Sequence, residues 1–252
     1  MRVVIMGSGG VGGYVGARLQ AAGEDVAFIP RGAHLQALQT EGLRLEHPQH
    51  PLHLLQVQAS ADPAELARGG PADLAVFAVK LGDAAAAARA LGPLLGPQTR
   101  ILTLQNGIDS VDLIRPNVGA TLVCGGVIYV SAVIDRPGVI RSPGGLHAIV
   151  ADAGSGDPVM AAFFAAFCNR LAGQAGRRHS RGAVGEVHRA DRAVGHHLVA
   201  ARADGRDPGP PRDPSAAASA RRGSGGRGRG RWRAAARWLG RRCDGEARRH
   251  AR

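Results

Sequence analysis

The sequence predicts an α/β protein, a doubly wound parallel sheet with an antiparallel extension, followed by a low-order tail. Two observations predict the sheet. Strand-like and helix-like segments alternate along residues 1–176, and the strand-like runs are apolar throughout. Strands of that kind are typical of parallel sheets that are covered by helices on both faces. The third observation is a sharp change of composition after residue 176, which predicts the tail.

The predicted elements follow one another in a regular order. We expect strands at "RVVIM" (2–6), "DVAFIP" (25–30), "ADLAVFAV" (72–79) and "RILTLQ" (100–105). We expect helices at "GYVGARLQAAG" (13–23), "AHLQALQTEG" (33–42) and "DAAAAARALGPLL" (83–95). The runs "TLVCGGVIYVSAVI" and "GVIRS", separated by "DRPG", predict the antiparallel extension. Apolar residues at helical spacing predict a last helix over 157–176.

The net charge of +12 on these 252 residues lies entirely in the last third of the chain. Residues 1–176 hold 12 basic and 13 acidic residues, whereas residues 177–252 hold 20 arginines, no lysine and seven acidic residues. The last third contains only six Ile, Leu, Val, Met or Phe residues, too few to offset the entropy cost of ordering it. We therefore predict a folded domain over 1–176 and a low-order tail over 177–252.

Cysteines and apolar runs indicate the compartment. Cys124, Cys168 and Cys243 have no metal-ligand spacing, and their sparse, odd number indicates a reducing compartment. Glycine interrupts the N-terminal segment too early for a signal peptide, and no apolar run reaches the ~20 residues of a membrane span. The four histidines within 179–197 have no firm ligand spacing either. The sequence therefore predicts a cytoplasmic protein with no metal site and no membrane partner.

The glycine-rich stretch "GSGGVGG" connects the first predicted strand to the first predicted helix. Gly7, Gly9 and Gly12 give the pattern G-x-G-x-x-G inside a β-α-β unit, which is typical of a dinucleotide-binding turn of the Rossmann type. The first glycine permits the tight turn, the second lets the backbone approach a pyrophosphate, and the third lets the helix pack close to the strand. Free N–H groups at the start of the helix favour phosphates. The predicted cofactor residues here are Gly7, Ser8, Gly9, Gly10, Val11 and Gly12.

Three polar residues follow the ends of the other predicted strands. Arg31 lies in "FIPRG", where an NAD site usually has an acidic residue, and an arginine favours the 2′-phosphate of NADP. Lys80, the only lysine in the chain, follows the strand in "FAVKLGD", at an edge where α/β sheets bind ligands. Asn106 follows the next strand in "LQNGID", and its amide can both donate and accept hydrogen bonds. Each of the three can also be interpreted as an ordinary surface or turn residue.

Taken together, four segments resemble ketopantoate reductase (2-dehydropantoate 2-reductase) over residues 1 to about 176. They are "GSGGVGGYVGARLQAAGEDVAFIPRGAHLQAL", "FAVK", "LQNGID" and "GGVIYVSAVIDRPGVIRSPGG". The resemblance implies NADPH-dependent reduction of 2-dehydropantoate to pantoate in pantothenate (vitamin B5) biosynthesis. It also implies a Rossmann domain, here 1–176, followed by a helical domain, with the active site between them.

The resemblance further assigns roles to individual residues. It places residues 7–12 on the pyrophosphate, Arg31 on the 2′-phosphate and Lys80 on the cofactor. Asn106 would contact both cofactor and substrate, and Ala132, in "YVSA", would lie near the nicotinamide.

The general acid of the resembled family has no counterpart in this sequence. The family uses a lysine of its helical domain, in a motif like "ALWEKF", whereas no lysine follows Lys80 here. We therefore assign no catalytic residue. For the chain as written we expect weak or absent cofactor binding and reductase activity near zero.

A shift of reading frame would explain the missing motif. The stretch "AVGEVH" at 183–188 can be encoded GCT GTG GGA GAA GTT CAT, and one base later, followed by C, this reads Leu-Trp-Glu-Lys-Phe-Ile. The stretches "RRHS" and "ARADGRDPG" can hide further family-like segments in the same frame. Our hypothesis is a single-base frameshift near residues 175–177.

Two other functions remain open from the sequence. The stretch "RRGSGGRGRGRWR" resembles an RGG-type RNA-binding segment, which would make the chain a dinucleotide-binding protein with a basic RNA-binding tail. If the tail has no such role, we expect it to bind nucleic acid only non-specifically. The chain can also be a Rossmann dehydrogenase of another 2-oxo or 3-hydroxy acid.

Overall fold

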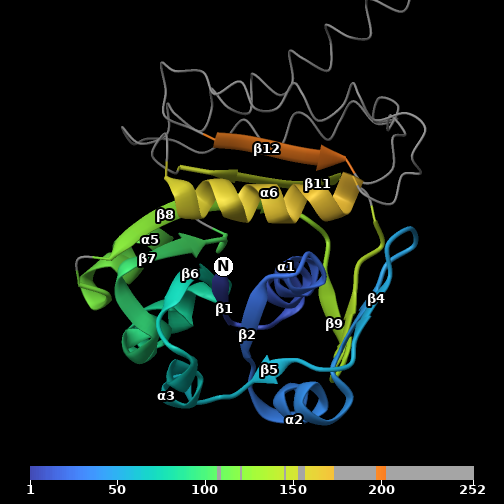
Figure 1. The fold of residues 1–252 in the computed structure, drawn as a ribbon, viewed down its shortest axis with the longest axis horizontal. Coiled ribbons are helices and arrows are strands. Elements are labelled where there is room, and N and C mark those ends of the chain that lie inside the picture. Colours follow the sequence, from blue (N-terminus) through green and yellow to red (C-terminus); the bar gives the residue numbers. More distant parts are fainter. Residues whose placement is uncertain (107–108, 120, 145, 153–156, 173–196, 203–252) are drawn as a thin grey trace, which may run out of the picture. The chain divides into compact units, whose positions relative to one another are not determined.

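An eight-stranded sheet forms the centre of the computed structural model (Figure 1). The structure describes residues 1–106, 109–119, 121–144, 146–152, 157–172 and 197–202. The chain divides into two units, Met1–Gly205 and Arg206–Arg252, and every described residue lies in the first. The strand order is β12-β11-β8-β7-β6-β1-β2-β5. The strands are β1 (Arg2–Met6), β2 (Asp25–Ile29), β5 (Gln58–Ala59), β6 (Ala72–Phe77), β7 (Leu95–Thr103), β8 (Leu122–Tyr129), β11 (Leu146–Ala151) and β12 (His197–Arg202).

Six neighbouring strands of this sheet, from β8 to β5, pair in parallel, as the sequence predicts. Strand β1 lies between β2 and β6, so that Val4 faces Ala27 on one side and Ala75 on the other. Because a strand buried on both faces has no solvated side, Val3, Val4, Ile5 and Met6 are all buried. This explains why the run "RVVIM" shows no polar alternation.

Helices cover both faces of the parallel sheet. Val3 and Ile5 pack in one core with side chains of α1 and α6, whereas Val4 and Met6 pack in a second core with side chains of α3, α4 and α5. This division follows from the period of two along a strand. The α-helices are α1 (Gly10–Ala21), α2 (Gly32–Glu41), α3 (Pro63–Leu66), α4 (Ala84–Ala90), α5 (Ser110–Ile114) and α6 (Pro158–Ala172). The short 3-10 helices are η1 (Ala67–Gly69), η2 (Leu81–Asp83), η3 (Gly92–Leu94) and η4 (Arg115–Asn117).

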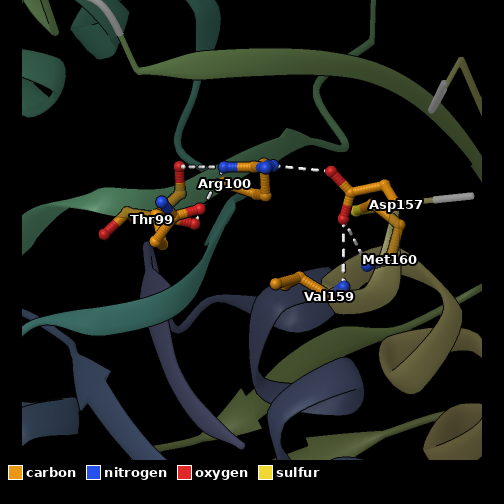
Figure 2. Close-up of polar contacts among 6 residues, drawn as sticks. Thr99, Arg100, Asp157, Val159 and Met160 are labelled. Atoms are coloured by element: carbon orange, nitrogen blue, oxygen red, sulfur yellow. Dashed lines mark hydrogen bonds and ion pairs between the residues drawn. The ribbon is translucent and has the colours of Figure 1, made fainter.

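The start of α6 is fixed to the sheet by polar contacts (Figure 2). Asp157 precedes the helix, and its Oδ1 accepts hydrogen bonds from the backbone N–H groups of Val159 and Met160. Its Oδ2 accepts a 2.6 Å hydrogen bond from Nε of Arg100 on β7. Pro158 at the first helical position suits this start, because proline lacks the N–H that would be left unpaired there.

The predicted antiparallel extension is divided between two sheets. Strand β8 pairs in parallel with β7 and then antiparallel with β11. The second half of the predicted segment forms the antiparallel hairpin β9–β10, which belongs to a separate sheet of order β4-β3-β10-β9. Its strands are β3 (Leu43–Glu46), β4 (Leu52–Leu54), β9 (Val133–Arg136) and β10 (Val139–Arg141).

Strand β12 lies inside the segment that the sequence predicts as a low-order tail. It pairs antiparallel with β11, from Leu146↔Arg202 to Ala151↔His197. Its six residues include Leu198 and Val199, two of the few apolar residues in that segment. The rest of the tail, with the arginine- and glycine-rich stretch, lies outside the described residues, so its low order, its proposed RNA binding and the boundary at 176 stay predictions.

Membrane-spanning helices and metal-binding clusters are both absent from the described residues. None of the helices in this part of the chain has the length and apolar character needed to cross a bilayer. No group of three or more His, Cys, Asp or Glu side chains within the same residues is arranged to hold a metal ion.

Candidate cofactor site

The strand order places a topological switch point between β1 and β6. The chain passes from β1 to β2 on one side, and later returns to β6 on the other side of β1. Loops that leave two such strands diverge, and the crevice at their carboxyl ends is where open α/β sheets bind ligands. Gly7 follows β1 and Lys80 follows β6 after two residues, so the two predicted sites lie at the carboxyl ends of these neighbouring strands.

Gly7 is required by the fold itself. Its φ of +93° lies in the left-handed region that side chains other than glycine rarely adopt. A Cβ on Gly7 would also lie 2.8 Å from the backbone nitrogen of Val79, beyond the end of β6. The turn is therefore held tightly against the neighbouring strand.

Gly9, in contrast, has open space where a side chain would be. It is the N-cap of α1 with φ of −73°, a conformation open to any residue, and a Cβ on it would meet nothing within 4 Å. The fold therefore does not demand glycine at this position. A ligand that approaches this part of the backbone closely would require glycine, because any side chain would occupy the ligand's space.

The first turn of α1 is suited to an anion. It contains no acidic residue, and no side chain caps the helix start. The N–H groups of its first residues have no partner within the helix, and the helix dipole adds partial positive charge there. Ser8 is buried, and its hydroxyl donates a long hydrogen bond of 3.4 Å to the carbonyl of Ile5. At Gly12, a Cβ would overlap the carbonyl oxygen of Gly7, which confirms the close approach of helix and strand.

Ala132 lies against the start of α1. A Cβ on Gly10 would overlap the carbonyl oxygen of Ala132, so the two backbones are in contact. Ala132 belongs to the connection between β8 and β9 and is half-buried. The structure thus brings together segments that are about 120 residues apart in the sequence.

Arg31 and Lys80 lie at the same edge of the sheet. Arg31 follows β2 as the N-cap of α2, and Lys80 is the N-cap of η2. Arg31 forms an ion pair of 3.6 Å with Asp83, the last residue of η2. Lys80 is exposed, so both cations are accessible to a ligand.

Asn106 is exposed just beyond β7, next to a residue that the sequence patterns do not single out. The amide of Gln105 is buried, donates a 2.8 Å hydrogen bond to the carbonyl of Val79 and lies 3.3 Å from the hydroxyl of Thr103. Gln105 therefore fixes the end of β7 to the end of β6, and so positions Asn106 relative to Lys80. The motif "LQNGID" contains it, but only the strand order reveals its role; Gly107 of that motif lies outside the described residues.

Two further side chains, His34 and Cys124, are structural. The ring of His34 on α2 accepts a 3.0 Å hydrogen bond from the N–H of Gly138 in the β9–β10 hairpin. Burial lowers the pKa of His34, and the backbone carbonyl of Ser8 opposes this shift. Cys124 is buried, and burial raises the pKa of its thiol to about 11, so it is a small core residue and no nucleophile.

Comparisons with known proteins point to one family. The sequence profile of "Ketopantoate reductase PanE/ApbA" matches residues 3–154. A protein of Mesorhizobium japonicum described as "2-dehydropantoate 2-reductase" is 35% identical over 162 residues, which are 56% of this chain and 48% of that protein. A protein of Halobacterium salinarum with the same description is 35% identical over 170 residues, 66% of this chain and 54% of the relative.

Solved structures give the same result. The crystal structure of a PanE/ApbA family ketopantoate reductase from Ralstonia eutropha JMP134 has a TM-score of 0.59 and 38% identity, and covers 66% of this chain and 54% of that one. The crystal structure of the 2-dehydropantoate 2-reductase from Geobacter metallireducens GS-15 has a TM-score of 0.58 and 27% identity, and covers 68% of this chain and 62% of that one. The chain spans about half the length of the curated relatives it matches. From its sequence, its fold and the arrangement of its glycine turn, this chain belongs to the PanE/ApbA ketopantoate reductase family of oxidoreductases.

Proposed function

We propose that residues 1–176 are the NADPH-binding half of a cytoplasmic 2-dehydropantoate 2-reductase of pantothenate biosynthesis. The observation that carries this proposal is Gly9, where the fold leaves open space in front of a helix start that favours anions. The family match and the accessible Arg31 at the same edge support it further.

Each residue at this edge then has a defined task. The N–H groups of the first turn of α1 bind the pyrophosphate, with Gly9 allowing its approach. Arg31 binds the 2′-phosphate with charge-assisted hydrogen bonds, and Lys80 contacts the cofactor. Asn106 would contact cofactor and 2-oxo acid substrate, and Ala132 would lie near the nicotinamide. When bound, NADPH supplies the hydride.

Binding can be tested at Gly9 without disturbing the fold. Of the weak or absent cofactor binding expected from the sequence, the proposal requires the first, weak but measurable NADPH binding. We expect Gly9→Ala to weaken it at least tenfold further, because the new methyl group occupies the space of the pyrophosphate. The free energy of unfolding of the Gly9→Ala variant should fall by less than about 1 kcal/mol, which is the range for a changed N-cap. Isothermal titration calorimetry with NADPH and urea unfolding measure the two quantities.

Gly92→Ala is the matched control for this test. Gly92 also has open space where a Cβ would lie and no positive φ, but it lies on η3, before β7, away from the carboxyl edge. Its NADPH affinity should equal that of the unchanged chain. If Gly9→Ala binds NADPH as tightly as Gly92→Ala, the glycine turn is not the cofactor site.

Turnover of the 252-residue chain should be near zero even where NADPH binds. Reduction of a ketone needs a proton donor at its oxygen, and residues 81–252 contain no lysine to act as the general acid of the family. Oxidation of NADPH in the presence of 2-dehydropantoate, followed by its absorbance over several hours, measures this. Ordinary turnover by this chain would contradict the expected loss of activity and would mean that another group donates the proton.

Resequencing the gene across codons 170–185 tests the frameshift hypothesis. An extra or missing base would restore the lysine motif and extend the helical pattern beyond residue 176. We then expect NADPH-dependent reductase activity from the corrected chain. An early stop codon in the shifted frame would contradict the hypothesis.

A further inference from the structure

The ion pair between Arg31 and Asp83 lies where the proposed function places the 2′-phosphate of NADPH. Nη1 of Arg31 is 3.6 Å from Oδ2 of Asp83, and the two side chains are 70% and 52% exposed. They come from connections after β2 and β6, the two strands that flank β1. The carboxylate of Asp83 therefore faces the guanidinium group that a phosphate would use.

A carboxylate at this position opposes a 2′-phosphate in two ways. It pairs with the positive charge of Arg31, so a phosphate must compete with the carboxylate for the guanidinium group. It also repels the phosphate, which carries up to two negative charges near neutral pH, across a few ångströms of solvent. Lys80, at the start of the same 3-10 turn, supplies one compensating positive charge.

The same carboxylate is compatible with a cofactor that lacks the 2′-phosphate. Acidic side chains near the end of the second strand accept hydrogen bonds from the ribose hydroxyls of NADH in Rossmann domains. Asp83 would offer such an acceptor from the turn after β6. Arg31 would remain paired with Asp83, so no charge is left uncompensated.

We infer that Asp83 determines the cofactor selectivity of this chain, weakening the preference for NADPH over NADH that Arg31 alone would produce. The inference rests on the proposed function, because it requires a dinucleotide at this edge. Neither the glycine pattern nor Arg31 indicates a role for Asp83 in the sequence, because only the folded structure brings Asp83 beside Arg31.

The test compares the binding of NADPH and NADH to the 252-residue chain and to Asp83→Asn. We expect the substitution to raise NADPH affinity roughly threefold to tenfold at low ionic strength, the range for one charge interaction near a protein surface. NADH affinity should stay equal or fall. In about 1 M salt the gain for NADPH should shrink below about twofold, because the Debye length is then about 3 Å.

Asp25→Asn is the matched control. Asp25 is 50% exposed and also pairs with an arginine, at 2.9 Å from Nη1 of Arg2, but it lies at the opposite end of β2. Asp25→Asn changes the net charge by the same amount as Asp83→Asn. It should leave the ratio of NADPH affinity to NADH affinity unchanged. An unchanged ratio in Asp83→Asn, or an equal shift in both variants, would overturn the inference while leaving the proposed function intact. If neither dinucleotide binds the unchanged chain or the variants, the proposed function fails, and the inference fails with it.

Discussion

Two arginine–aspartate pairs in this protein have the same chemistry and different surroundings. Arg100 and Asp157 are 2.6 Å apart, with side chains that are 20% and 9% exposed. Arg31 and Asp83 are 3.6 Å apart and mostly exposed. The first pair joins α6 to the sheet, whereas the second lies at the proposed cofactor edge.

The number of hydrogen bonds distinguishes the two pairs. Asp157 also caps α6 through Val159 and Met160, and Arg100 also donates to the carbonyls of Gln98 and Thr99 (Figure 2). Both partners are thus engaged within the protein. Arg31 and Asp83, at greater distance and in solvent, retain capacity for other partners. A pair can exchange a protein partner for a ligand only when it is not already satisfied on all sides.

Removing the less exposed aspartate, Asp157, should have the largest effect. We expect Asp157→Ala to lower the free energy of unfolding by about 2–3 kcal/mol, because it removes a helix cap and leaves Arg100 without its partner. Asp157→Asn should lose about half as much, since asparagine is a good N-cap but carries no charge. Urea unfolding followed by circular dichroism measures both. Equal losses in the two variants would show that the cap contributes little.

The stability due to Asp157 should also depend on pH. Burial acts to raise the pKa of Asp157, but hydrogen bonds from Arg100 and from the N–H groups of Met160 and Val159 outweigh it, and the pKa is lowered. A carboxyl group whose pKa is lowered by folding stabilises the protein above its unfolded pKa, about 3.9, and this stability is lost as the pH falls through the folded pKa.

Comparison of the unchanged chain with Asp157→Asn isolates this titration. Their difference in the free energy of unfolding should be on the order of 1 kcal/mol near neutral pH and should shrink as the pH falls below about 4. Urea unfolding at a series of pH values measures the difference. A difference that is constant across this range would mean that the charge of Asp157 is not what stabilises the helix start.

The sequence predicts the parallel sheet and the glycine turn well, because their signals are local. The run "RVVIM" and the spacing of Gly7, Gly9 and Gly12 are each contained in a few neighbouring residues. Helix α1 begins at Gly10, three residues before the predicted start at 13, because the low helix propensity of glycine hides its first turn from the sequence pattern. The close approach of Ala132 explains why position 10 is a glycine.

Elements that depend on distant partners could not be predicted. The short strands β3, β4 and β5 have mixed polar and apolar residues, and β3 is completed by pairing with β10, about 95 residues later. For the same reason, the roles of Asp83 and Gln105 could not be predicted from the sequence. Each lies in a recognisable motif, but its role follows from which strands are neighbours, and strand order is not a local property.

The smallest effect on stability should come from breaking the exposed pair. We expect Arg31→Ala and Asp83→Ala each to change the free energy of unfolding by less than about 0.5 kcal/mol, because exposed ion pairs gain little in water. Urea unfolding of Arg31→Ala and Asp83→Ala, measured in parallel with Asp157→Ala, gives the comparison directly. A loss above about 1 kcal/mol in either variant would place Arg31 and Asp83 with the structural pair, and a pair that the fold needs cannot release its arginine to a phosphate without cost.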